Sequence, residues 1–183
     1  MFSGENIDII EHRTVPQIAL RAPRGSRIEP DGLNVVPEVR KVHYSTPVLA
    51  TRLRDGDWVG HTGKRIRYIV NIGVGGSYPG PQMAYLALQP NSDRSLSFRF
   101  IANVDDAVSA AAVRDLDPAE TLFVISSRTF TTLETMESAP ACREWVRAHL
   151  GRDSGIARHS VAVSTNVKAA RQYGIDSTNI FCF

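Results

Sequence analysis

The chain has 183 residues, of which 43% are apolar and 22% are charged, and its formal net charge is +2. This length suits one well-packed α/β domain, and the composition is typical of globular proteins rather than of disordered, collagenous or disulfide-stabilised ones. The charge is spread without a basic block and no apolar run reaches about 18 residues, so the sequence indicates neither nucleic acid nor a membrane as a partner.

Residues 1–64 carry five of the ten prolines and little regular periodicity. Because an interior proline costs a helix about 3 kcal/mol, we predict an irregular N-terminal segment over these residues. It contains two short helices, at residues 11–21 and 46–58, and a loop at residues 22–37.

From residue 65 onward, β-rich apolar runs alternate with helical patterns. The predicted strands are residues 66–72, 97–104, 122–125, 160–163 and 180–183, and the predicted helices are residues 81–88, 105–116, a stretch ending at 150, and 166–173. Pro140 is expected to break or kink the third helix, with Ser138 capping a second segment. Right-handed crossovers make this order an α/β fold, a three-layer sandwich with a mostly parallel five-stranded sheet over residues 65–183.

The loop after the first predicted strand, residues 73–80, is rich in glycine and is called the glycine loop here. Glycines let the backbone approach a ligand closely, and the next helix contributes its positive N-terminus, so this loop suits a phosphate. It is not a dinucleotide fingerprint, because Tyr78 stands where a glycine is required, and there is no Walker A motif. The alternative is a strand-to-helix turn that binds nothing.

The loop after the third predicted strand, residues 126–132, holds two serines, three threonines and Arg128, and is called the hydroxyl loop here. Hydroxyl groups and a guanidinium can hold phosphate oxygens. The alternative is that these residues merely cap the following helix. Since ligands of open α/β sheets bind beyond the carboxyl ends of the strands, the two loops are predicted to converge on one phosphate, with no metal and no general base in either loop.

Other candidate groups give weaker signals. Glu134 follows the hydroxyl loop and is a possible accessory acid, base or orienting group, or simply a first-turn acid that the helix dipole stabilises. Residues 164–166 resemble a third hydroxyl loop, for which N-capping is the favoured interpretation. The five histidines are scattered and interpreted as surface or packing residues. Cys142 and Cys182 lie far apart, which predicts neither a zinc site nor a disulfide framework and makes the reducing cytosol the default compartment.

The two loops resemble segments of one enzyme family. Residues 71–77 (NIGVGGS), followed by Gly80-Pro81, resemble the NIGIGGSxLGP segment of the glucose-6-phosphate isomerase family, and residues 127–135 (SRTFTTLET) resemble its SKTFTTxET segment. Shorter matches follow in the family's order at residues 1–6, 19–21, 61–64, 103–105, 163–166 and 174–176.

The resemblance implies a sugar-isomerase (SIS) domain of Rossmann-like architecture. It implies a cytoplasmic enzyme, usually a homodimer, that interconverts glucose 6-phosphate and fructose 6-phosphate through a cis-enediol without metal or cofactor. The partner is then a hexose 6-phosphate. Carried over by position, Gly76 and Ser77 lie against the substrate. The phosphate is held by Ser127, Arg128, Thr129 and Thr132.

Departures from the family pattern qualify this expectation. Family members are about three times longer, so we expect this chain to correspond to a middle portion that lacks the glutamate base and is inactive by itself. Arg128 replaces the family's lysine, and Tyr78-Pro79 replace its Asp-Leu. Three interpretations stay open: a fragment of the isomerase, a non-catalytic phosphosugar-binding or regulatory module, and a degenerate copy.

Overall fold

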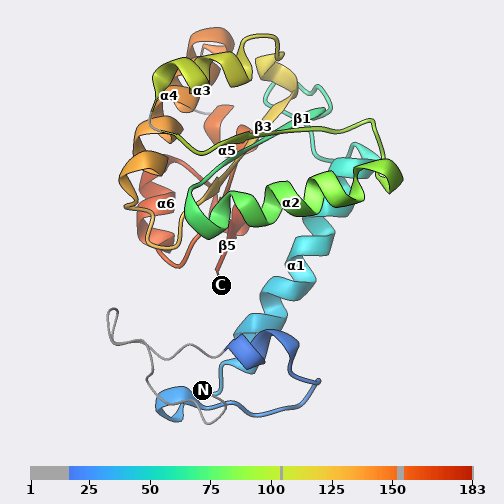
Figure 1. The fold of residues 1–183 in the computed structure, drawn as a ribbon, viewed down its shortest axis with the longest axis vertical. Helices are drawn as coiled ribbons and strands as arrows, with labels where there is room; N and C mark the ends of the chain where they lie inside the picture. Colours follow the sequence, from blue (N-terminus) through green and yellow to red (C-terminus); the bar gives the residue numbers. More distant parts are fainter. Residues whose placement is uncertain (1–16, 104, 152–154, 183) are drawn as a thin grey trace. The chain divides into compact units, whose positions relative to one another are not determined.

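The computed structural model describes residues 17–103, 105–151 and 155–182 (Figure 1). The chain forms two compact units, Met1–Val48 and Leu49–Phe183, and each is described by itself. The boundary between them falls within helix α1 (Val36–Asp55). The sequence instead predicts a functional division between an N-terminal segment, residues 1–64, and a phosphosugar-binding domain, residues 65–183. This division stays a prediction.

From residue 17 onward, where the structure describes the first unit, two 3₁₀ helices precede α1: η1 (Gln17–Arg21) and η2 (Pro30–Gly32). Ala19, Ala22 and Val36 form its small buried core. Of the helix predicted at residues 11–21, only the 3₁₀ turn falls within the described residues.

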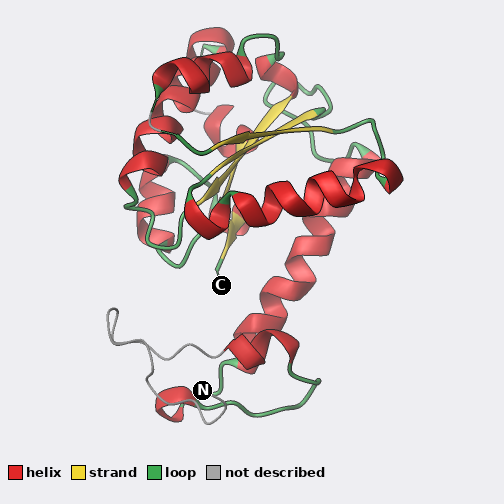
Figure 2. Cartoon of the chain, viewed as in Figure 1, coloured by secondary structure: helices red, strands yellow, loops and turns green. Residues whose placement is uncertain are grey.

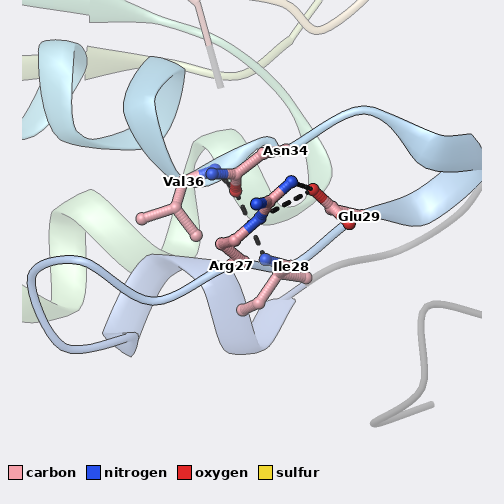
Figure 3. Close-up of polar contacts among 5 residues, drawn as sticks. All are labelled: Arg27, Ile28, Glu29, Asn34 and Val36. Atoms are coloured by element: carbon pink, nitrogen blue, oxygen red, sulfur yellow. Dashed lines mark hydrogen bonds and ion pairs between the residues drawn. The ribbon is translucent and has the colours of Figure 1, made fainter.

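Asn34 organises the start of α1 (Figure 3). Its Oδ1 accepts hydrogen bonds from the backbone N–H of Val36 at 3.2 Å and of Ile28 at 3.3 Å. One of these donors belongs to the first turn of the helix, which has no intrahelical partner for it. The adjacent Arg27 and Glu29 form an exposed ion pair, with Nε 2.9 Å from Oε1. The asparagine thus fixes the point at which loop becomes helix.

Helix α1 corrects the prediction for residues 46–58, because it begins ten residues earlier, at Val36. Pro37 is its second residue, where a missing N–H is harmless. Pro47 lies inside the helix, and its missing N–H frees only the carbonyl of the exposed His43. A freed carbonyl that solvent can reach is tolerated, so the proline does not end the helix.

The second unit is built on the predicted sheet, whose strands are yellow in Figure 2. Within the described residues the sheet has five strands, in the order β2-β1-β3-β4-β5. All neighbouring pairs are parallel, so the predicted α/β fold is confirmed. The strands are β1 (Tyr68–Ile72), β2 (Ser97–Ile101), β3 (Thr121–Ser126), β4 (Ser160–Val163) and β5 (Ile180–Phe181). The helices are α2 (Pro79–Leu88), α3 (Asp106–Val113), α4 (Leu133–Leu150), α5 (Ile156–His159) and α6 (Val167–Tyr173).

Helices flank the sheet. Residues of α3, α4 and α6 join Val70, Ile72 and Ile125 in the main buried core, and these helices lie together in Figure 1. Helix α2 instead packs against β2, where the Tyr85 ring lies 5.1 Å from Phe98 and 5.9 Å from Phe100 between centroids.

The described residues of α2 include none that is buried, although the helix is strongly apolar. Met83, Leu86 and Leu88 are 69%, 59% and 62% exposed. An apolar helix with its outer side chains in water is uncommon in a soluble monomer.

Helix α4 corrects the prediction that Pro140 breaks the helix, because it runs unbroken from Leu133 to Leu150 with Pro140 inside. Pro140 is exposed. Ser138 caps no second segment: its hydroxyl oxygen lies 2.9 Å from the Asn103 carbonyl and 3.0 Å from the Glu134 carbonyl, and its single proton is available to either. Packing of its buried face holds the helix together across the proline. The predicted end at Gly151 is confirmed, since that residue has φ 71° and donates to the Arg147 carbonyl.

His159 is a buried packing residue that joins three segments. Its Nδ1 lies 2.7 Å from the Thr121 carbonyl, and its Nε2 lies 2.8 Å from the backbone N of His61. A carbonyl only accepts and an amide only donates, so the ring carries its proton on Nδ1 and is neutral. Burial holds the pKa of His159 below its ordinary value, and the bond to Thr121 acts in the opposite direction.

Candidate functional site

The glycine loop leaves the carboxyl end of β1 and turns sharply before α2. Its residues Gly75–Ser77 form the 3₁₀ helix η3, closed by Tyr78 N–H donating to the Gly75 carbonyl at 3.0 Å. Gly75 has φ 54°, a left-handed conformation that glycine adopts without strain. Gly76 is exposed and Ser77 is half-buried, so a ligand at this edge of the sheet can reach both.

The first turn of α2 supplies fewer free backbone N–H groups than an ordinary helix N-terminus, on which the predicted phosphate site depends. Pro79 and Pro81 have no N–H, and the N–H of Gln82 already bonds to the Tyr78 carbonyl at 3.0 Å. Gly80 therefore carries the unengaged N–H of this turn. The two prolines are visible in the sequence and could have shown that this helix end is a poor anion site.

The hydroxyl loop folds back on itself beyond β3. The Ser127 and Thr132 hydroxyls share a hydrogen bond of 3.2 Å, and Thr131 donates to Thr129 at 2.8 Å. Thr132 occupies the N-cap position of α4, yet its side chain makes no capping bond. The interpretation of these residues as simple caps is therefore wrong for Thr132. Its hydroxyl contacts that of Ser127 instead. Both residues belong to the predicted phosphate-binding group.

Phe130 holds the hydroxyl loop in a strained shape. It has φ 55°, which is rare for a bulky side chain and costs about 1–3 kcal/mol. Its ring is buried and meets the Tyr173 ring edge-on at 6.0 Å. The Tyr173 hydroxyl donates to the Ala139 carbonyl at 2.6 Å. The aromatic packing offsets the backbone strain and fixes the tight turn that brings Ser127 to Thr132.

Residues 164–166, which follow β4, hold the hydroxyl loop in place through hydrogen bonds to its main chain. The Arg128 carbonyl accepts three hydrogen bonds, from the Thr165 N–H at 2.9 Å, the Thr165 hydroxyl at 2.7 Å and the Ser164 hydroxyl at 3.0 Å. Asn166 donates its side-chain N–H to the Thr129 carbonyl at 2.9 Å and also caps α6. Capping was predicted for these residues. Their role as a clamp was missed, although three short polar residues at a strand end are its signal.

The glycine loop and the hydroxyl loop touch each other. They follow β1 and β3, which are neighbouring strands with Ile72 opposite Ile125. A Cβ on Gly73 would lie 2.8 Å from the Ser126 carbonyl oxygen and 2.9 Å from the Ser77 Cβ. Only a residue without a side chain fits there. The two loops therefore lie together at one edge of the sheet, as the predicted convergence on one phosphate requires.

The other predicted groups lie on the hydroxyl loop and in the helix that follows it. Arg128 is half-buried and Thr129 is exposed on the hydroxyl loop, and Glu134 is half-buried in the first turn of α4. Within the described residues, no group of three His, Cys, Asp or Glu side chains could hold a metal ion. A helix long and apolar enough to cross a bilayer is likewise absent from that part of the chain.

The sequence matches the model of one protein family, described as phosphoglucose isomerase, over residues 1–183. The chain belongs to the phosphoglucose isomerase family. Curated relatives named glucose-6-phosphate isomerase include those of Anaeromyxobacter sp. (strain K), 54% identical, and Roseiflexus sp. (strain RS-1), 55% identical, each over 183 residues. Each alignment covers 100% of this chain and 34% of the relative. The chain thus spans about a third of the length of these phosphoglucose isomerase relatives.

Solved structures support the fold. The glucose-6-phosphate isomerase of Chlamydia trachomatis superposes with a TM-score of 0.74 at 24% identity, over 99% of this chain and 33% of its own. A hypothetical protein of Thermus thermophilus gives a TM-score of 0.59 at 24% identity, over 91% of this chain and 38% of its own. At this identity the likeness concerns the architecture alone.

Proposed function

We propose that the glycine loop and the hydroxyl loop bind a hexose 6-phosphate, and that the chain is the phosphosugar-binding part of a glucose-6-phosphate isomerase. The observation that carries the proposal is the contact between the two loops at Gly73 and Ser126. It sets the paired hydroxyls of Ser127 and Thr132 on a loop that touches the exposed glycine turn, at the edge where α/β sheets bind ligands. Family membership adds the identity of the sugar.

Each loop has a distinct role in this proposal. Ser127, Arg128, Thr129 and Thr132 hold the phosphate, the hydroxyls by hydrogen bonds and the guanidinium by charge. Gly76 and Ser77 lie against the sugar. Aldose–ketose interconversion through a cis-enediol also requires a positioned base, and no catalytic residue is assigned within this chain, with Glu134 as a possible accessory group. A homodimer in the cytoplasm is part of the same proposal.

Thermal unfolding with ligands tests the proposal. We expect glucose 6-phosphate to raise Tm, because a ligand at 100 times its Kd stabilises the folded state by about 2.7 kcal/mol. Glucose alone should have no effect, and inorganic phosphate a smaller one. The double variant Ser127→Ala with Thr132→Ala should lose the shift.

A matched double variant, Ser97→Ala with Thr62→Ala, makes the same chemical changes at exposed positions away from both loops and should retain the shift. Absence of any shift with glucose 6-phosphate for the unmodified chain would contradict the proposal. A coupled isomerase assay of the purified chain separates a binding module from an enzyme: we expect binding without turnover, and turnover would show that the chain itself supplies a base.

A further inference from the structure

We propose that Asn71 is a positioning residue that sets the sugar-contacting Ser77 at a fixed place relative to the phosphate-holding hydroxyl loop. The inference rests on the proposed function and deepens it, because it names what aligns the two halves of the site. Asn71 itself touches no substrate in this proposal.

Asn71 is bonded to both loops at once. It is the fourth residue of β1 and is 8% exposed. Its side-chain nitrogen donates to the backbone carbonyl of Ser77 at 3.0 Å, and its Oδ1 accepts from the hydroxyl of Ser126 at 3.0 Å. Ser126 is the last residue of β3, where the hydroxyl loop begins. One amide group therefore spans the gap between the end of the glycine turn and the base of the hydroxyl loop.

The chemistry of these two bonds calls for an amide. The Ser77 carbonyl can only accept, so the nitrogen of Asn71 must face it, and the oxygen is left for the Ser126 hydroxyl. An aspartate has the same shape but offers no donor, and it would set a charged oxygen against the carbonyl. Because Asn71 is buried, the aspartate charge would be poorly solvated where it opposes the carbonyl, and the turn would shift.

The surroundings make such a shift consequential. Gly73 packs against the Ser126 carbonyl and the Ser77 Cβ, so the turn already lies at its closest approach to β3. The hydroxyl loop is held independently by the bonds that Ser164 and Thr165 make to the Arg128 carbonyl and that Asn166 makes to the Thr129 carbonyl. Loss of the Asn71 donor should therefore displace the sugar side of the site and leave the phosphate side in place.

Isothermal titration of the full chain with glucose 6-phosphate and, separately, with inorganic phosphate tests this. For Asn71→Asp we expect about tenfold weaker binding of glucose 6-phosphate, which corresponds to the loss of one hydrogen bond. The affinity for inorganic phosphate should change by less than about twofold. Asn179→Asp is the matched control. Asn179 also donates its amide to a backbone carbonyl, that of Ala157 at 3.2 Å, but it precedes β5 at the opposite end of the strands.

Ser126→Ala keeps the test decisive if Asn71→Asp fails to fold. It removes the hydrogen bond that anchors Oδ1 and leaves the bond to Ser77, so glucose 6-phosphate binding should weaken by less than in Asn71→Asp and phosphate binding should persist. Parallel loss of both ligands in these variants would mean a merely structural role and would overturn the inference, as would unchanged binding of both. If the unmodified chain binds neither ligand, the proposed function falls first and the inference with it.

Discussion

Replacing Gly73 with alanine tests how tightly the glycine loop packs on the end of β3. The added Cβ would lie 2.8 Å from the Ser126 carbonyl oxygen and 2.9 Å from the Ser77 Cβ, closer than real Cβ contacts allow. Neither neighbour can give way easily. Ser126 is held in register with Val163 of β4, and the Ser77 carbonyl is held by the Asn71 amide.

The expected cost follows from this geometry. Overpacking against fixed atoms destabilises a protein by about 1–3 kcal/mol. A loss of about 2 kcal/mol lowers Tm by about 4–8 °C in a chain of this size. The loop should also move away from β3, so Gly73→Ala should weaken binding of glucose 6-phosphate as well.

Gly76→Ala is the matched control, three residues along the same loop. A Cβ there meets nothing within 4 Å, and alanine at a permitted glycine position changes stability by about 0.4–1 kcal/mol in the favourable direction. Because Gly76 is proposed to lie against the sugar, this variant should keep or slightly raise its Tm and still lose affinity for glucose 6-phosphate. Urea unfolding and ligand titration of both variants give the comparison. Equal stability of Gly73→Ala and the unmodified chain would refute the close packing of the two loops.

Three further predictions concern single residues. Burial lowers the pKa of His159 in the folded state, so near and below the ordinary pKa of about 6.5 the unfolded chain binds more protons than the folded one. The free energy of unfolding should therefore fall as the pH drops below that value. Urea unfolding from pH 8 to 5 should show this dependence, and His159→Gln should reduce it. Thr165→Val removes one of three donors to the Arg128 carbonyl and should weaken phosphate binding about threefold to tenfold, while an unchanged titration would argue against the clamp. Burial raises the pKa of Cys142 to about 12, so a thiol reagent at pH 8 should label it only after unfolding, and rapid labelling of the native chain at that residue would contradict its burial.

Much of the fold was predictable because its signals are local. The five strands, the Asp105 cap of α3 and the left-handed glycines that end α4 and α6 are all set by neighbouring residues. The two errors concern proline. At Pro47 and Pro140 the rule that proline ends a helix failed because solvent or tertiary packing compensates for the missing N–H, and neither effect is visible in a short window of sequence.

The site was predictable in its parts but not in its connections. Residue type and position at strand ends predicted the glycine loop and the hydroxyl loop. The links between them depend on which strands are neighbours, and therefore on tertiary structure. The bonds of Ser126 to the Asn71 side-chain amide and of Thr165 to the Arg128 carbonyl join residues 55 and 37 positions apart. A single sequence shows that such side chains can donate, but not which carbonyl they reach.

The three hydrogen bonds to the Arg128 carbonyl affect which substitutions the proposed site can accept during evolution. The clamp holds the main chain at position 128, and these main-chain bonds do not depend on which side chain stands there. An exchange between lysine and arginine can therefore alter how charge is presented to a phosphate, from a point to a planar fork, while the three bonds to the carbonyl remain available. Substitution of Ser164 or Thr165, more than thirty residues away, would instead remove bonds to the loop. The conformation of the hydroxyl loop thus depends partly on residues 164 and 165, which do not contact the ligand in our proposal.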